Sequence, residues 1–139
     1  MIDMPYVWYF ADGDRPAPGG GPHVAHEALM ILNPSPSDAH LELDLFWTDR
    51  PPTRGIALSV DTERVRCVRL DRPEEIGGVC IPARTQYAMR LRADQPVVVQ
   101  YGRLETAAAN YALMSSSGYH AGGGTAHELS QTVGGGEPR

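Results

Sequence analysis

Short apolar runs that alternate with polar residues, separated by prolines and glycines, constrain this fold most. In segment 40–48 every second residue is apolar, at Leu41, Leu43, Leu45 and Trp47. Segment 85–93 repeats the pattern with Tyr87, Met89 and Leu91. A period of two is typical of strands with one face on a core, because successive side chains point to opposite faces. The chain is therefore predicted to be built from strands.

The turn residues divide the chain into short pieces. We expect a loop over 12–23, which is rich in proline and glycine, and an antiparallel hairpin of 24–33 with 40–48 across the sequence NPSPSD. Further strands are expected at 56–60, 64–70, from Val79, over 85–93 and at 97–101. Segment 107–119 has an alanine-rich start, but its later residues fit a strand, and we assign it as one.

Many short strands without a long helix indicate an all-β fold, an antiparallel β-sandwich or jelly-roll-like single domain. The domain is predicted to span residues 1–120. Residues 121–139 contain two Gly triplets and few residues able to bury surface, so we expect a flexible Gly-rich tail there.

Composition narrows the class of protein. The chain has 139 residues, which fits one domain, and its net charge of −5 argues against a surface built to grip phosphate backbones. Cys67 and Cys80 are the only cysteines, too few for a disulfide scaffold. The sequence shows neither a secretory signal nor an apolar run long enough to span a bilayer, so we expect a cytoplasmic protein.

His26, Glu27 and His40 are candidate metal ligands if the expected hairpin brings them together. On a strand, however, Glu27 points to the face opposite His26. The favoured interpretation is that these are polar groups hydrogen-bonded at a sheet edge, and no metal or cofactor is predicted.

Nucleophilic catalysis has little support, because there is no GxSxG motif and neither cysteine has an activating neighbour. Glu27, Asp49 and Glu105 would act as hydrolytic carboxylates only if the fold placed them together, and scattered acids are more often surface charges. We predict no catalytic residues and no enzymatic activity.

Two groups of arginines are candidates for a basic, anion-binding stripe on one sheet. Arg64, Arg66 and Arg69 lie close in sequence, and Arg90 and Arg92 share a strand face. Such a stripe would suit DNA phosphates. We favour the alternative, in which the arginines pair across strands with Glu42, Asp44 and Glu63.

Arg103 and Trp8 carry more specific hypotheses. A guanidinium at the end of the apolar run 97–101 must be paired or face a cleft, with Glu105, Asp49 or Glu27 as candidate partners. A buried ion pair and a ligand-binding role are both open for Arg103. Trp8 would either stack on a sugar ring or close the core.

An ordered series of motifs resembles the soluble sensory rhodopsin transducer family. The series runs over residues 6–119 and consists of His26–Glu27, Ile31–Asn33, Asp38–His40, Thr48–Pro51, Val97–Leu104 and Ala112 through Ser115 to Tyr119, with Trp8, Gly13 and Pro16 before them. The sequence departs from the family pattern in the 71–86 connection and in the Gly-rich tail.

The resemblance implies a β-sandwich that assembles as a homotetramer without known catalysis, linked to a microbial rhodopsin, to DNA or to a sugar-like small molecule. It also implies a polar set of ligand-binding residues, namely Trp8, His26, Glu27, Asn33, Asp49, Arg50, Gln100 and Arg103. Our first hypothesis is a small-molecule binding and signalling module. The alternatives are a regulator that docks on a photoreceptor or on DNA, and a small carbohydrate-active enzyme that uses Glu27.

Overall fold

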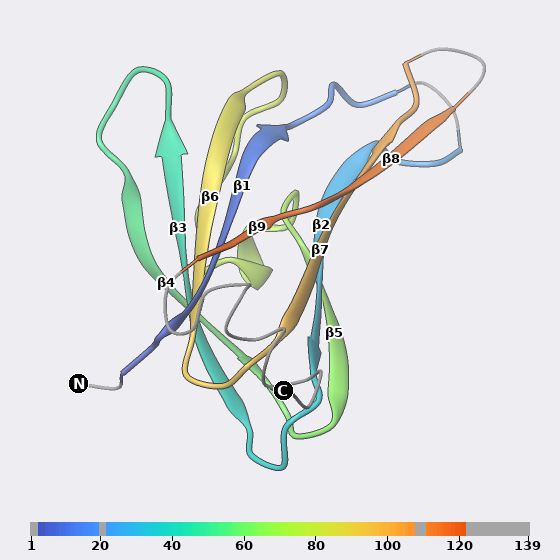
Figure 1. Cartoon of the computed structure of the whole chain (residues 1–139). Helices are drawn as coiled ribbons and strands as arrows, with labels where there is room; N and C mark the ends of the chain where they lie inside the picture. Colours follow the sequence, from blue (N-terminus) through green and yellow to red (C-terminus); the bar gives the residue numbers. More distant parts are fainter. Residues whose placement is uncertain (1–2, 20–21, 108–110, 122–139) are drawn as a thin grey trace, which may run out of the picture.

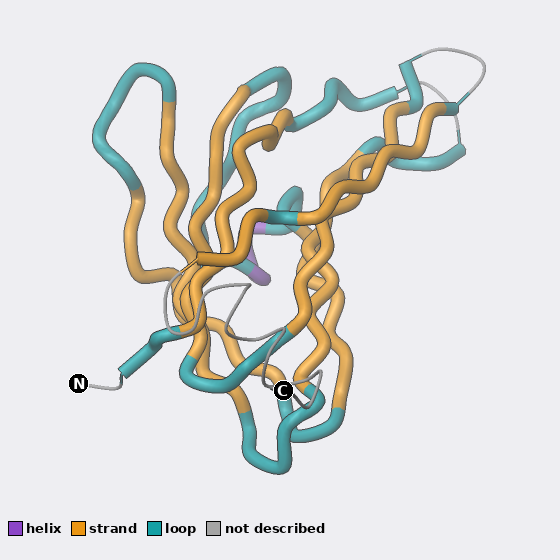
Figure 2. Tube along the Cα trace, in the orientation of Figure 1, coloured by secondary structure: helices purple, strands orange, loops and turns teal. Residues whose placement is uncertain are grey.

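The computed structural model describes residues 3–19, 22–107 and 111–121, which form an antiparallel β-sandwich (Figures 1 and 2). One sheet has the strand order β4-β3-β6-β1-β9 and the other β5-β2-β7-β8. The strands are β1 (Tyr6–Asp14), β2 (His26–Asn33), β3 (Ala39–Trp47), β4 (Thr53–Val60), β5 (Arg64–Arg69), β6 (Gln86–Ala93), β7 (Val98–Glu105), β8 (Ala112–Ser117) and β9 (Tyr119–Ala121). A short 3₁₀ helix, η1 (Pro73–Glu75), follows β5. The predicted fold class is confirmed.

The core lies between the two sheets, where the alternating patterns place their apolar residues. Leu43 of β3 pairs with Leu91 of β6, and both are fully buried. On the opposite sheet, Leu29 and Ile31 of β2 are also fully buried. The period-two interpretation of 40–48 and 85–93 is therefore confirmed.

The predicted hairpin of 24–33 with 40–48 is wrong, because β2 and β3 lie in different sheets. β2 pairs with β5 and β7, whereas β3 pairs with β4 and β6. The connection is held by Asn33, whose amide donates to the carbonyls of Ser37, Val60 and Asp61 at 2.8, 3.1 and 3.2 Å. Its buried side chain thus fixes a crossover between the sheets.

Two other predictions need correction. Asp12, Gly13 and Asp14 belong to β1 and not to a loop, because the ladder with β6 resumes at Gly13 after an irregularity that begins at Phe10. A Cβ at position 13 would lie only 2.8 Å from the Tyr87 ring, so the glycine permits this close approach. The run from Val79 forms no strand, although Val79 packs on the core.

The end of the described chain joins the two sheets. β8 pairs with β7, and β9 pairs with β1 on the other sheet, so the ribbon crosses from one sheet to the other between them (Figure 1). The strand predicted within 107–119 is confirmed for 112–117. Residues 122–139 lie outside the described residues, so the flexible tail stays a prediction.

Candidate functional site

The carboxylate of Glu27 lies between the two sheets and accepts hydrogen bonds from both. Its Oε1 accepts from the Tyr87 hydroxyl of β6 at 2.9 Å. Its Oε2 accepts from the backbone N–H of Asp14 in β1 at 2.8 Å and from the Tyr101 hydroxyl of β7. The side chain has no solvent exposure. Glu27 therefore links its own strand β2 to three others.

Burial controls the ionisation of this group. Desolvation raises the pKa of Glu27 above its ordinary value of 4.5, although the hydrogen bonds from Tyr101, Asp14 and Tyr87 and the charge of Arg103 oppose the rise. Burial and the neighbouring carboxylate also raise the pKa of Tyr87 and that of Tyr101. Both phenols therefore stay neutral and act as donors to Glu27.

Arg103 extends the group toward the surface. Its Nη1 donates to the Tyr101 oxygen at 3.3 Å, and its Nη2 lies 3.5 Å from the sulfur of Met114. Its Nε lies 3.1 Å from Glu105 Oε2, close enough for an ion pair although not aligned as a hydrogen bond. We call Glu27, Tyr87, Tyr101 and Arg103 the Glu27 cluster. Of the partners predicted for Arg103, Glu105 is direct, Glu27 is reached through Tyr101, and Asp49 is not involved.

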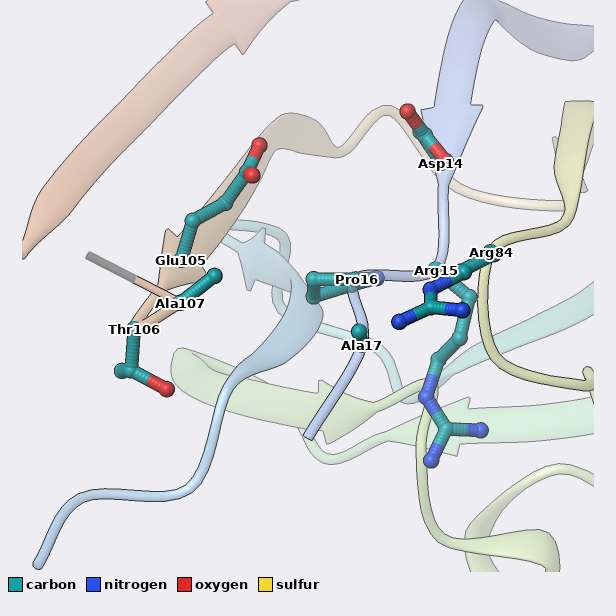
Figure 3. A pocket seen from close by; sticks show the side chains of 8 residues that line it. All are labelled: Asp14, Arg15, Pro16, Ala17, Arg84, Glu105, Thr106 and Ala107. Carbon is teal, nitrogen blue, oxygen red and sulfur yellow. The ribbon is translucent and has the colours of Figure 1, made fainter. Parts of the chain in front are cut away.

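Two surface clefts border the Glu27 cluster. The tyrosine cleft, of about 320 Å³, is lined by Tyr9, Phe10, Ala11, Asp12, Tyr101, Ser116, Ser117 and Tyr119. The arginine cleft, of about 370 Å³, is lined by Asp14, Arg15, Pro16, Ala17, Arg84, Glu105, Thr106 and Ala107 (Figure 3). Tyr101 belongs to the first cleft and to the cluster, while Asp14 and Glu105 contact the cluster from the second. Both volumes are in the range of small-molecule sites.

The other residues of the predicted polar set are spread over the molecule. Asn33 is occupied at the sheet crossover, and Gln100 is exposed on the outer face of β7. Asp49 and Arg50 form an ion pair with each other in the exposed loop after β3, where Arg50 also lies 4.3 Å from the Trp47 ring centre. Apart from the sequence neighbours Asp49 and Arg50, only Glu27 and Arg103 of the set come together.

Trp8 and His26 occupy different surroundings again. Trp8 packs against the core with its ring 4.9 Å from that of His120, in an edge-to-face arrangement. His26 Nδ1 contacts the carbonyl of Val24 at 2.7 Å. Their ligand-binding roles stay predictions.

The hypothetical metal ligands do not converge. Glu27 faces the interior, whereas His40 belongs to the other sheet and contacts Asp94 at 3.1 Å. Within the described part of the chain, no group of three or more His, Cys, Asp or Glu side chains is arranged to hold a metal ion. The hairpin that was expected to bring His26 close to His40 does not form, because β2 and β3 lie in different sheets.

Arg90 and Arg92 are engaged in ion pairs across the strands. Arg90 Nη2 lies 2.6 Å from Asp44, and Arg92 Nη2 lies 2.9 Å from Glu42 and 3.3 Å from Asp44. Burial by itself would raise the pKa of Asp44, but the N–H of Gly55 and the two guanidiniums lower it overall. Cross-strand pairing is therefore confirmed for these two arginines, although not for Glu63, which forms no ion pair among the described residues.

The sequence analysis missed the two tyrosines that complete the cluster. The alternation in 85–93 already placed Tyr87 inward, and the apolar run 97–101 included Tyr101. A buried tyrosine hydroxyl needs a polar partner, and a buried carboxylate needs donors. A buried carboxylate and two buried tyrosine hydroxyls in one sequence could therefore have indicated that the tyrosines donate to Glu27.

The fold and site define a two-sheet β-sandwich with an interior carboxylate and two small clefts. The chain matches the family model of the Anabaena sensory rhodopsin transducer over residues 5–120, and it belongs to that family. The resemblance predicted from the sequence motifs is thus confirmed.

Two solved structures share the fold. The crystal structure of Thermotoga maritima 1070 is 28% identical, with a TM-score of 0.73, and the match covers 86% of this chain and 96% of that one. The Anabaena sensory rhodopsin transducer is 30% identical, with a TM-score of 0.58, and the match covers 73% of this chain and 90% of that one. No curated protein matches the chain. Among the described residues, none of the helices has the length and apolar character needed to cross a bilayer.

Proposed function

We propose that this protein is a non-enzymatic module that binds a small, sugar-like molecule in the tyrosine cleft and passes the signal on through the Glu27 cluster. The observation that carries the proposal is the position of Tyr101, which lines the cleft and also donates to the buried Glu27 carboxylate. A ligand that contacts Tyr101 would act on a group that links both sheets.

The lining of the tyrosine cleft suits a polyhydroxyl ligand. Tyr9 and Tyr119 are 40% and 70% exposed, so their rings would be available to stack on the C–H face of a sugar. Ser116 and Ser117 offer hydroxyls, and the Asp12 carboxylate accepts hydrogen bonds from ligand hydroxyls. The volume of about 320 Å³ fits one sugar ring better than an oligosaccharide.

The state of Glu27 supports binding over catalysis. Both carboxylate oxygens already accept hydrogen bonds, and the side chain is shielded from solvent. A general acid or base must lie within hydrogen-bond reach of the substrate. In this proposal Glu27 and Arg103 position Tyr101 and do not touch the ligand.

We further propose a homotetramer, the assembly implied by the family. On the outer face of the β5-β2-β7 sheet, Val65, Leu32 and Val98 are paired side by side and are 69%, 42% and 56% exposed. The next row contains Cys67, Met30 and Gln100, so neither row carries a charge. An uncharged face of this kind suits an identical face on a second copy, as in a two-fold interface.

For the signalling partner we propose a microbial rhodopsin met from the cytoplasm. The similar solved protein is named as the transducer of a sensory rhodopsin, which favours this partner. DNA is the weaker candidate, because Arg90 and Arg92 are already neutralised by Asp44 and Glu42. Co-purification with a microbial rhodopsin from the same organism would support docking, and retention on DNA at moderate salt would favour the DNA alternative.

Thermal shift with a panel of neutral sugars and polyols tests the ligand proposal. A ligand that binds the native state raises the melting temperature by mass action. The shift should disappear in Tyr9→Ala and persist in Tyr6→Ala, which removes a ring outside the cleft lining. An absence of any shift across the panel, or an equal shift in both variants, would contradict the proposal.

A further inference from the structure

We propose that the arginine cleft is a second binding site, which takes a small oxyanion carried by a polar metabolite. The carboxylate or phosphate oxygens of the ligand would lie against Arg84 and Arg15. Figure 3 shows these arginines on one side of Pro16, with Glu105 and Thr106 on the other. The inference is independent of the ligand proposed for the tyrosine cleft.

The charge balance of the lining favours a monoanion. Four charged side chains line the cleft, namely Arg15, Arg84, Asp14 and Glu105. Glu105 is offset by Arg103, whose Nε lies 3.1 Å away. Two guanidiniums and the Asp14 carboxylate remain, which leaves a local excess of one positive charge. The chain as a whole carries −5, so the attraction would come from the cleft itself.

The backbone holds the two arginines next to each other. The N–H of Arg15 donates to the carbonyl of Thr85 at 2.9 Å, and the N–H of Arg84 donates to the carbonyl of Arg15 at 2.6 Å. These bonds continue the β1–β6 ladder beyond its last pair, Asp14 with Gln86. Because the main chain of both arginines is fixed in this way, no backbone freedom has to be lost there when a ligand binds.

The protein engages the two arginines to different extents. Arg84 is exposed and has a φ of 60°, a left-handed conformation that favours glycine over a long side chain. The Arg15 guanidinium donates from Nη1 to the carbonyl of Ile81. Among the described residues, neither arginine has a carboxylate within ion-pair distance.

The ligand must be small. The cleft volume of about 370 Å³ admits a sugar acid or a comparable metabolite, but not a polymer. Two guanidiniums beside one carboxylate match an acidic group attached to a body with hydroxyls, because the Asp14 carboxylate can accept from those hydroxyls.

Titration calorimetry on the full chain at low ionic strength tests the proposal with three probes: glucuronate, inorganic phosphate and glucose. Glucose lacks the carboxylate of glucuronate but keeps the ring. The cleft variant is Arg84→Gly, because glycine suits the φ of that position and the fold should persist. Glu63→Gly is the matched control, since Glu63 has a φ of 54° and lies in the turn before β5.

Wild type and Glu63→Gly should bind glucuronate or phosphate, and Arg84→Gly should bind the same probe about tenfold more weakly or worse, as expected for the loss of a charged hydrogen-bonding partner. Binding of glucuronate alone would identify a carboxylate site, and binding of phosphate alone a phosphate site. Binding of neither probe, or equal affinity in Arg84→Gly, would overturn the proposal. Tyr9→Ala should leave oxyanion binding unchanged, so failure here is distinguishable from failure of the tyrosine cleft.

Discussion

Replacing Glu27 separates the hydrogen-bonding role of this residue from its charge. In Glu27→Ala, the Asp14 N–H and the hydroxyls of Tyr87 and Tyr101 all lose their acceptor. An unsatisfied buried donor costs about 1 to 3 kcal/mol, so three donors cost about 3 to 9 kcal/mol before relaxation. Water that enters the space would reduce this, and we expect a loss of about 3 kcal/mol or more. A domain of this size has a free energy of unfolding of about 5 to 15 kcal/mol.

Glu27→Gln should be far milder. The amide oxygen can take the place of Oε2 and accept from Asp14 and Tyr101, while the amide nitrogen donates to the Tyr87 oxygen. The variant loses one hydrogen bond to a charged group, but it also removes a buried charge, so we expect a change within about 1.5 kcal/mol.

Urea unfolding followed by tryptophan fluorescence measures both variants. Protein concentration must be held constant, because assembly would contribute to the apparent stability. Glu74→Ala, which removes an exposed glutamate, is the control and should change stability by less than about 0.5 kcal/mol. A loss below about 1 kcal/mol in Glu27→Ala, or equal losses in the alanine and glutamine variants, would refute the reasoning.

Three further predictions concern pH, the sheet crossover and the close approach at Gly13. Because burial raises the pKa of Glu27, the folded state holds the proton of the Glu27 carboxyl more tightly than the unfolded state does. The free energy of unfolding should therefore fall as pH rises from 4.5 through the raised pKa, and it should fall less steeply in Glu27→Gln. Identical pH profiles of unfolding for the two proteins would contradict this prediction. Asn33→Ala removes the donor shared by the carbonyls of Ser37, Val60 and Asp61, and chemical denaturation should show a loss of about 2 kcal/mol; a neutral result would rule out a structural role for this amide. Gly13→Ala places a Cβ 2.8 Å from the Tyr87 ring, and the melting temperature should drop by several degrees unless the ring moves freely.

The pattern of the sequence predicted the faces of the strands better than their partners. The period of two in 40–48 required Leu41, Leu43 and Leu45 to share a face, whichever strand lay beside them. Nothing in NPSPSD distinguishes a hairpin turn from a crossover between sheets. The Asn33 amide decides that question through carbonyls from residues about 27 positions away, and such contacts are invisible to local pattern.

The candidate site, too, could be predicted from the sequence only in part. The strand period placed Glu27 on the face opposite His26, but the expectation of a polar group at a sheet edge was wrong, because Glu27 is fully buried on β2, which lies between β5 and β7. An engaged Arg103 followed from the cost of burying an unpaired charge. Neither argument could show that Tyr101 stands between them, because that depends on the register of β2 with β7. The family motifs marked Asn33 and Asp49 together with Glu27, but the fold places these residues in separate surroundings.

The most direct test of the central claim is the NMR spectrum of the tyrosine rings during titration with the best neutral sugar from the thermal-shift panel. The chain has 6 tyrosines, and three of them, Tyr9, Tyr101 and Tyr119, line the tyrosine cleft. We predict saturable shifts of these three ring signals while the signal of Tyr6 stays in place. Shifts confined to tyrosines outside the cleft, or no shift at saturating sugar, would contradict a ligand site in the tyrosine cleft.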